Sequence, residues 1–282
     1  MQKFLFWLHT HKWVCVLAIF VYSLFIVFMH SSFVYLSIIV MNYFSLPLYN
    51  WLVTSVLFVF LGTFIYFIFN HIRKYKHPIK SQLLYLVVTL VLIIIHFITL
   101  FEMNIEIIHV LEYAGLAVLF YVLFARAGAA IIFSIPIMLW DEWRQYVILY
   151  PSYVQYFELN DIVIDILGSG FVLVSLSVFG ISIKSNSLLI WKLPELHFLF
   201  TLILATIFSF NFGWIVDYQS EVQINTVFIM NKMSNHFDFW NIHPFTKAQY
   251  HILSPNWGVS IILVLSLFYI SFDRITEIYT SS

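Results

Sequence analysis

Apolar runs of about twenty residues recur along this chain, and they constrain its fold more than any other feature. A helix needs about 20 mostly apolar residues to cross the hydrocarbon core of a membrane. Composition agrees, because 62% of the residues are hydrophobic and only 10% are charged, whereas about a quarter of the residues of a soluble domain are charged. The sequence therefore predicts an all-α fold, a polytopic transmembrane helical bundle.

Eight spans are predicted from these runs and from the residues that interrupt them. They cover residues 13–29, 48–69, 81–101, 104–125, 129–150, 161–183, 193–216 and 257–272. Three parts follow from them. Residues 1–80 are predicted to form two N-terminal helices and a basic loop, and residues 81–183 are predicted to form a four-helix core. Residues 184–282 are predicted to form two C-terminal helices, with a long extracytoplasmic loop at about 217–256 between them.

The distribution of Lys and Arg predicts how the bundle is oriented. With eight spans and a cytoplasmic N-terminus, ten of the thirteen Lys and Arg residues fall on the cytoplasmic side, as the positive-inside rule requires. We therefore predict a multi-pass protein of the cell inner (cytoplasmic) membrane, with both termini cytoplasmic and the lipid bilayer as its partner. The chain shows no nucleic-acid-binding pattern. Its single cysteine, Cys15, excludes an internal disulfide and a cysteine metal cluster.

Ionisable side chains interrupt four neighbouring predicted spans, all toward the outer end. A charged side chain in a membrane helix costs about 2.5–3.5 kcal/mol on insertion scales, so such residues indicate a functional site. Because successive spans run in opposite directions, these side chains are expected to converge at one depth. They are His96 in the third span, Glu106, His109 and Glu112 in the fourth, Asp141, Glu142 and Gln145 in the fifth, and Asp161 and Asp165 in the sixth.

Helical spacing adds detail to this polar set. Glu106 and His109 share a face if one helix covers both, and Asp161, Asp165 and Gly168 are spaced to share a face of the sixth span. Gly168 would allow that helix to approach a neighbour closely.

Two interpretations of the polar set stay open. One is an interhelical hydrogen-bond network, in which His109 and Arg144 pair with carboxylates. The other is a binding site, because seven carboxylates, counting Glu102, cannot all be ionised without a cation nearby. A divalent cation is therefore an open hypothesis for a cofactor. The spacing E-x-x-H is half of a di-iron carboxylate motif, but no second copy is present.

Three short motifs follow one another in this region. They are E-x-x-H-x-x-E-Y-x-x-L from Glu106 to Leu116, D-E-x-x-Q from Asp141 to Gln145, and D-x-x-x-D-x-x-G from Asp161 to Gly168. In this order, each beside a predicted span, they resemble the motifs of VanZ-like membrane proteins over about residues 81–183. That family is named for resistance to the glycopeptide teicoplanin, so the resemblance implies a cell-envelope role. The chain departs from the family at residues 146–160, which lack the Arg that members usually carry.

Two functions from different classes follow. The first is binding of, or action on, a lipid-linked or amphiphilic envelope component at an acidic, histidine-containing pocket on the extracytoplasmic side. The second is a non-catalytic scaffold with a membrane-protein partner, in which the polar network is structural. Whether the protein is an enzyme is left open. For the first function, the catalytic candidates are His109, Glu112 and Asp141, and the binding candidates are Glu106, Glu142, Gln145, Asp161 and Asp165.

The segment at about 217–256 is long for a loop, and loops of this length usually have a function or carry short elements of their own. Its aromatic and polar residues suit either an interfacial flap or a lid over the acidic site. A zinc site built from His236, His243 and His251 is disfavoured, because their spacing matches no common zinc pattern.

Overall fold

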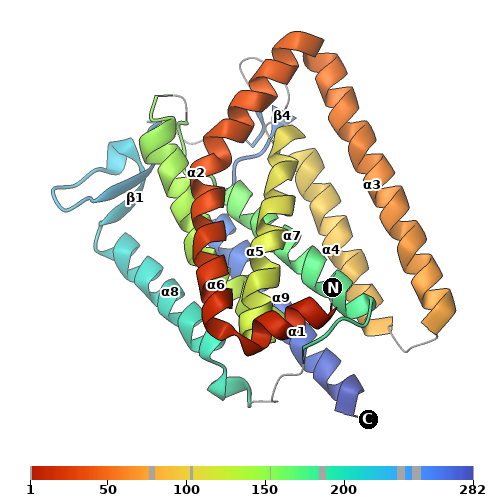
Figure 1. Ribbon diagram of the computed structural model, residues 1–282. Coiled ribbons are helices and arrows are strands. Elements are labelled where there is room, and N and C mark those ends of the chain that lie inside the picture. Colours follow the sequence, from red (N-terminus) through yellow and green to blue (C-terminus); the bar gives the residue numbers. More distant parts are fainter. Residues whose placement is uncertain are drawn as a thin grey trace.

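The computed structural model describes residues 2–75, 80–101, 104–152, 154–183, 189–233, 239–242 and 249–281. Within these segments the chain forms a bundle of nine α-helices, with two short two-stranded sheets at one end. Both ends of the chain lie at the opposite end of the bundle (Figure 1). Seven helices are long and apolar enough to cross a membrane. The protein is therefore a polytopic, all-α membrane protein.

The N-terminal helices are α1 (Gln2–Thr10), α2 (Lys12–Phe44) and α3 (Leu46–Tyr75). The predicted span 13–29 ends too early, because α2 continues unbroken to Phe44. No proline or glycine interrupts residues 30–44, and the helix stops only at Ser45, where a positive φ of 69° turns the chain. Pro47 then lies in the first turn of α3, where proline is tolerated. As a result His30 lies inside a helix.

Helix α3 lies at the outer edge of the bundle (Figure 1). None of its most apolar window is buried. Phe64 packs against Phe171 of α7 (Leu159–Val178), with ring centroids 4.9 Å apart. The remaining apolar surface of α3 is suited to contact with lipid.

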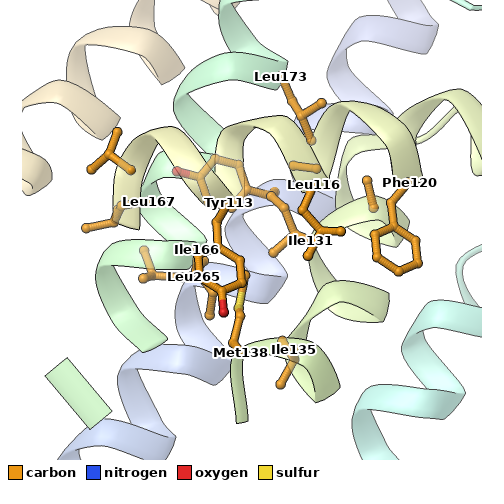
Figure 2. Close-up of a cluster of buried hydrophobic side chains, with 14 of the residues drawn as sticks. Tyr113, Leu116, Phe120, Ile131, Ile135, Met138, Ile166, Leu167, Leu173 and Leu265 are labelled. Atoms are coloured by element: carbon orange, nitrogen blue, oxygen red, sulfur yellow. The ribbon is translucent and has the colours of Figure 1, made fainter. Parts of the chain in front are cut away.

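The core is formed by α7 together with α4 (Lys80–Thr99), α5 (Ile108–Phe124), α6 (Ala127–Arg144) and α9 (Pro255–Ser281). Helix α7 contacts all four of these helices, and 83% of its apolar window is buried. The side chains that fill the space between the helices are mostly Leu, Ile and Val, with Phe, Tyr and Met among them (Figure 2). Helices α4, α5, α6 and α9 thus pack around α7.

The predicted span 129–150 corresponds to α6 and to the single π-helical turn η2 (Gln145–Leu149) that follows it. Helix α6 is 18 residues long. It is not among the seven helices that are apolar enough to span a membrane, and it carries three charged residues near its end, Asp141, Glu142 and Arg144. The other seven predicted spans each correspond to one of those helices, including α8 (Pro194–Asn211).

The predicted outer segment carries short strands. Strand β1 (Ile215–Tyr218) pairs in parallel with β2 (Phe228–Asn231), and β3 (Asn241–Ile242) pairs antiparallel with β4 (Gln249–Tyr250). The Phe157 amide donates to the Met230 carbonyl at 2.8 Å, which attaches β2 to the connection between α6 and α7. Just after β2, Lys232 Nζ donates to three carbonyl oxygens of the same connection, those of Tyr146, Pro151 and Val154.

Candidate functional site

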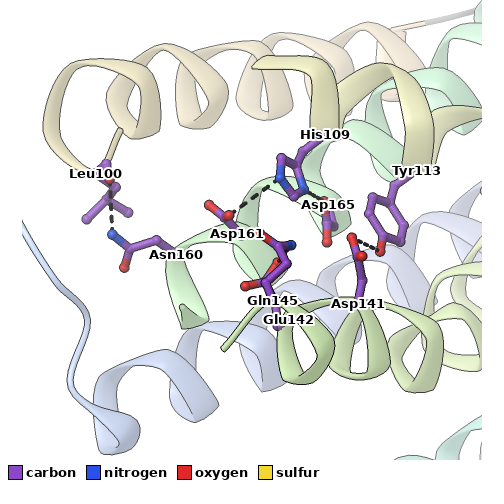
Figure 3. A network of polar contacts seen from close by, with 9 residues as sticks. All are labelled: Leu100, His109, Tyr113, Asp141, Glu142, Gln145, Asn160, Asp161 and Asp165. Atoms are coloured by element: carbon purple, nitrogen blue, oxygen red, sulfur yellow. Dashed lines mark hydrogen bonds and ion pairs between the residues drawn. The ribbon is translucent and has the colours of Figure 1, made fainter. Parts of the chain in front are cut away.

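A cluster of ionisable side chains is buried where α5 and α7 begin and α6 ends, away from the chain termini (Figures 1 and 3). His109 of α5, which is 1% exposed, lies between Asp161 and Asp165 of α7. Its Nδ1 is 3.0 Å from Asp165 Oδ1, and its Nε2 is 3.4 Å from Asp161 Oδ2. The spacing of four residues on α7 thus places two carboxylates against one imidazole.

Helix α6 supplies the third side of the cluster. Glu142, which is 2% exposed, accepts a hydrogen bond from Gln145 Nε2 at 2.9 Å. Ligand-type atoms of His109, Glu142 and Asp161 all lie within 4.8 Å of one another. Asp141, one position earlier, accepts a hydrogen bond from the Tyr113 hydroxyl at 3.2 Å (Figure 3).

The close approach of α5 and α7 brings these residues together. A Cβ atom at Gly168 would lie 2.6 Å from the Cα of Val110, so the two backbones are nearly in contact there. One residue later, Ser169 Oγ donates to the Tyr113 carbonyl at 3.2 Å. The predicted role of Gly168 in helix packing is confirmed, and the contact lies beside His109.

Two predicted site residues are placed differently from the rest. Glu112 is buried, and within the described chain both of its carboxylate oxygens lack a hydrogen-bond partner. Glu106 is half-buried in η1 (Asn104–Ile107), a 3₁₀ turn that precedes α5. Because the α-helix begins only at Ile108, the continuous helical face expected for Glu106 and His109 does not form. Glu102 lies outside the described residues, as do His236 and His243 of the outer segment.

Two further histidines lie beside the cluster: His30, which is outside the predicted polar set, and His96, which belongs to that set but not to the catalytic or binding candidates. His30 of α2 is 6% exposed, and its ring centroid lies 5.5 Å from that of His109. His96 of α4 is 2% exposed and lies within range of electrostatic interaction with His109. Extending the first apolar run past residue 29 would have placed His30 inside a span. The sequence predicts that His96 lies within a span, but its spacing does not link it to the three motifs.

Within the described chain Arg144 forms no salt bridge with a carboxylate, although its charge acts on nearby Asp141. Its Nη1 donates to the Val27 carbonyl at 2.6 Å, and its guanidinium lies 4.6 Å from the centre of the Phe28 ring. These contacts connect the end of α6 to α2. Arg144 therefore stabilises the packing of two helices around the cluster.

Asn160 fixes the start of α7 beside the cluster. Its Nδ2 donates to the carbonyls of Leu100 and His251, at 3.0 and 2.8 Å, and its Oδ1 accepts from the Leu253 amide at 3.0 Å. One side chain thus joins the end of α4, the start of α7 and the end of the outer segment (Figure 3 shows the contact with Leu100).

The buried cluster combines an imidazole with carboxylates at hydrogen-bonding distance, which suits proton transfer or cation binding. No family model, curated protein or solved structure matches this chain significantly. The protein is a polytopic membrane protein with a buried histidine–carboxylate cluster.

Proposed function

We propose that this protein is a VanZ-like protein of the bacterial cytoplasmic membrane, and that it binds or acts on a lipid-linked or amphiphilic component of the cell envelope. The observation that supports the proposal best is the convergence of the three motifs. Each motif supplies a side chain to one cluster, which contains His109, Glu142 and Asp161. The three motifs, which are separate in the sequence, thus contribute to one cluster in the fold.

The composition of the cluster favours ligand binding over packing alone. A packing network needs one or two satisfied pairs, whereas five buried carboxylates surround His109: Glu112, Asp141, Glu142, Asp161 and Asp165. Within the described chain Asp141 Oδ1, Asp161 Oδ1 and Asp165 Oδ2 have no hydrogen-bond partner. Leaving one buried polar group unpaired costs about 1–3 kcal/mol. These atoms are therefore expected to interact with a ligand, a cation or a proton.

The positions of basic residues support an extracytoplasmic location for the cluster. At the end of the bundle that holds the termini, basic residues occur beside several helices. They are Lys3, Lys12, Arg73, Lys80, Arg126, Lys192 and Arg274. Under the positive-inside rule this end is cytoplasmic. The cluster lies at the opposite end, where an envelope component would arrive.

The proposal is tested with two near-isosteric substitutions, His109→Gln and Asp165→Asn, in a host that lacks the native gene. If the proposal holds, the wild-type gene raises resistance to teicoplanin in this host, and we expect each variant to accumulate in the membrane at the wild-type level but to lose that resistance, because the altered groups bind the ligand. Accumulation is measured by immunoblot of membranes, and the phenotype as the minimal inhibitory concentration.

Asp273→Asn is the control for damage to folding. Asp273 accepts hydrogen bonds from the Ala127 and Gly128 amides, both at 2.7 Å, at the other end of the bundle. If the phenotype falls in proportion to accumulation in all three variants, the cluster has a structural role and the scaffold function is the better one.

A further inference from the structure

We propose that the cluster binds one divalent first-row transition-metal ion, with His109 Nε2, Glu142 and Asp161 as its protein ligands. The role of the ion rests on the proposed function, since the ion would act on the envelope ligand. Binding of the ion is nevertheless measurable without any knowledge of that ligand.

The distances within the cluster suit a shared ion. Two ligands of a tetrahedral ion with bonds of about 2.0–2.2 Å are about 3.3–3.6 Å apart. His109 Nε2 and Asp161 Oδ2 are 3.4 Å apart, which is longer than a charge-assisted hydrogen bond of about 2.7–2.9 Å. Glu142 completes a set of three whose ligand atoms lie within 4.8 Å of one another, so a small inward movement would bring all three to bonding distance.

The neighbours of these three residues have the arrangement that metal ligands need. With the Nδ1–H of His109 donated to Asp165 Oδ1 at 3.0 Å, the lone pair of Nε2 points toward Asp161 (Figure 3). A carboxylate that orients a histidine in this way is a regular feature of metal sites. Gln145 orients Glu142 through its hydrogen bond of 2.9 Å.

Unpartnered buried nitrogens beside the cluster are an independent indication of a ligand. Within the described chain, both ring nitrogens of His96 and the Nδ1 of His30 lack hydrogen-bond partners. Both residues are more than nine-tenths buried, and the His30 ring lies 5.5 Å from that of His109. Burial of unpaired polar groups is unfavourable. The unpaired nitrogens of His30 and His96 therefore indicate that a bound group, beyond the protein's own side chains, completes this region.

The mixture of ligands indicates the class of ion. Mg²⁺ and Ca²⁺ prefer sites made of oxygen atoms, whereas imidazole favours ions such as Zn²⁺ and Fe²⁺. A doubly charged ion would also offset part of the negative charge of the five buried carboxylates. Three protein ligands leave a coordination position open, as in catalytic zinc sites. That position could hold water or an oxygen atom of the envelope ligand.

The test uses purified full-length protein in detergent, stripped with a chelator and titrated with Co²⁺ and then with Zn²⁺. We expect one Co²⁺ per chain with visible absorption bands, displacement of Co²⁺ by Zn²⁺, and no displacement by Mg²⁺ at the same concentration. His109→Gln and Asp161→Asn should weaken Co²⁺ binding at least about 100-fold, because each removes a ligand. Asp165→Asn should weaken it about 10–100-fold, because it removes only the group that orients His109.

His251→Gln is the matched control, because His251 stacks on Phe239 in the outer segment and is not one of the three ligands. It should bind Co²⁺ as the wild type does. If Asp161→Asn does not yield folded protein, Glu142→Gln gives the same test. Absence of stoichiometric Co²⁺ in folded wild-type protein, or wild-type binding by the folded ligand variants, would overturn the metal site.

Failure of the metal site and failure of the proposed function give different results. A wild-type protein that binds no Co²⁺, while His109→Gln loses teicoplanin resistance, would overturn the metal site and leave the proposed function standing. Stoichiometric Co²⁺ that is lost in Asp161→Asn, with no change of phenotype in any variant, would support the metal site and contradict the proposed function.

Discussion

At the scale of single residues, Asn160 connects three separate segments beside the cluster. Its carboxamide contacts backbone groups of Leu100, His251 and Leu253, and the next residue along the chain is Asp161. A polar side chain that is 4% exposed and satisfied by three backbone groups has a structural role. It fixes the first turn of α7 and with it the position of a site carboxylate.

Asn160→Ala is expected to destabilise the protein by roughly 1–3 kcal/mol, because it leaves buried backbone groups without their partners. It should also make the outer segment more sensitive to protease. Asn211→Ala is the matched control, since Asn211 is exposed and its Nδ2 donates only within its own helix, to Ile207. Thermal unfolding in detergent and limited proteolysis measure the two effects, and equal behaviour of both variants would contradict this role.

At the level of the helices, α7 carries most of the architecture of the site. It presents Asp161 and Asp165 to His109. Its contact with α5 also includes Gly168 against Val110 and the hydrogen bond from Ser169 to the Tyr113 carbonyl. The separation of these two helices therefore sets the distance between the imidazole and both aspartates.

Gly168→Ala should lower the melting temperature, because the added methyl group would meet the backbone of Val110 and force the helices apart. Overpacking of this kind typically costs about 1–3 kcal/mol. Gly62→Ala is the control, because a Cβ there has no atom within 4 Å, and alanine favours the helix by up to about 1 kcal/mol. A Gly168→Ala protein as stable as the wild type would contradict the close contact.

Part of this arrangement could be predicted from the sequence, because helical spacing puts residues four apart on one face. Spacing alone grouped Asp161 with Asp165 and placed the polar ends of the spans at one depth. It could not predict that His30 belongs to the site, since polar residues such as Ser31 and Ser32 resemble the end of a span but are tolerated within a helix. Nor could it predict the 3₁₀ turn at Glu106, which depends on how the chain enters α5.

At the scale of the whole molecule, successive long helices run in opposite directions. Both chain ends therefore lie at one end of the bundle and the cluster lies at the other (Figure 1). The distribution of Lys and Arg is the basis of the proposed orientation, in which the end with the termini is cytoplasmic. A labelling experiment tests this orientation, and the native protein offers a low background because Cys15 is its one cysteine and is buried.

In intact cells a membrane-impermeant maleimide should label Glu221→Cys in η4 (Gln219–Glu221) and should not label Lys192→Cys in η3 (Ile190–Lys192) until the cells are opened. Both positions are exposed, so access to the reagent is decided by the side of the membrane. The reverse pattern would place the cluster at the cytoplasmic face and remove the support for an envelope ligand.

The length of α2 has a mechanical consequence. At about 1.5 Å per residue its 33 residues span about 50 Å, which exceeds a bilayer of about 40–45 Å including headgroups. A helix that outruns its bilayer tilts or thickens the lipid around it. His30 lies near the middle of this helix, against His109. Because α2 brings His30 to the cluster, we expect the geometry of the cluster to depend on the thickness of the host membrane.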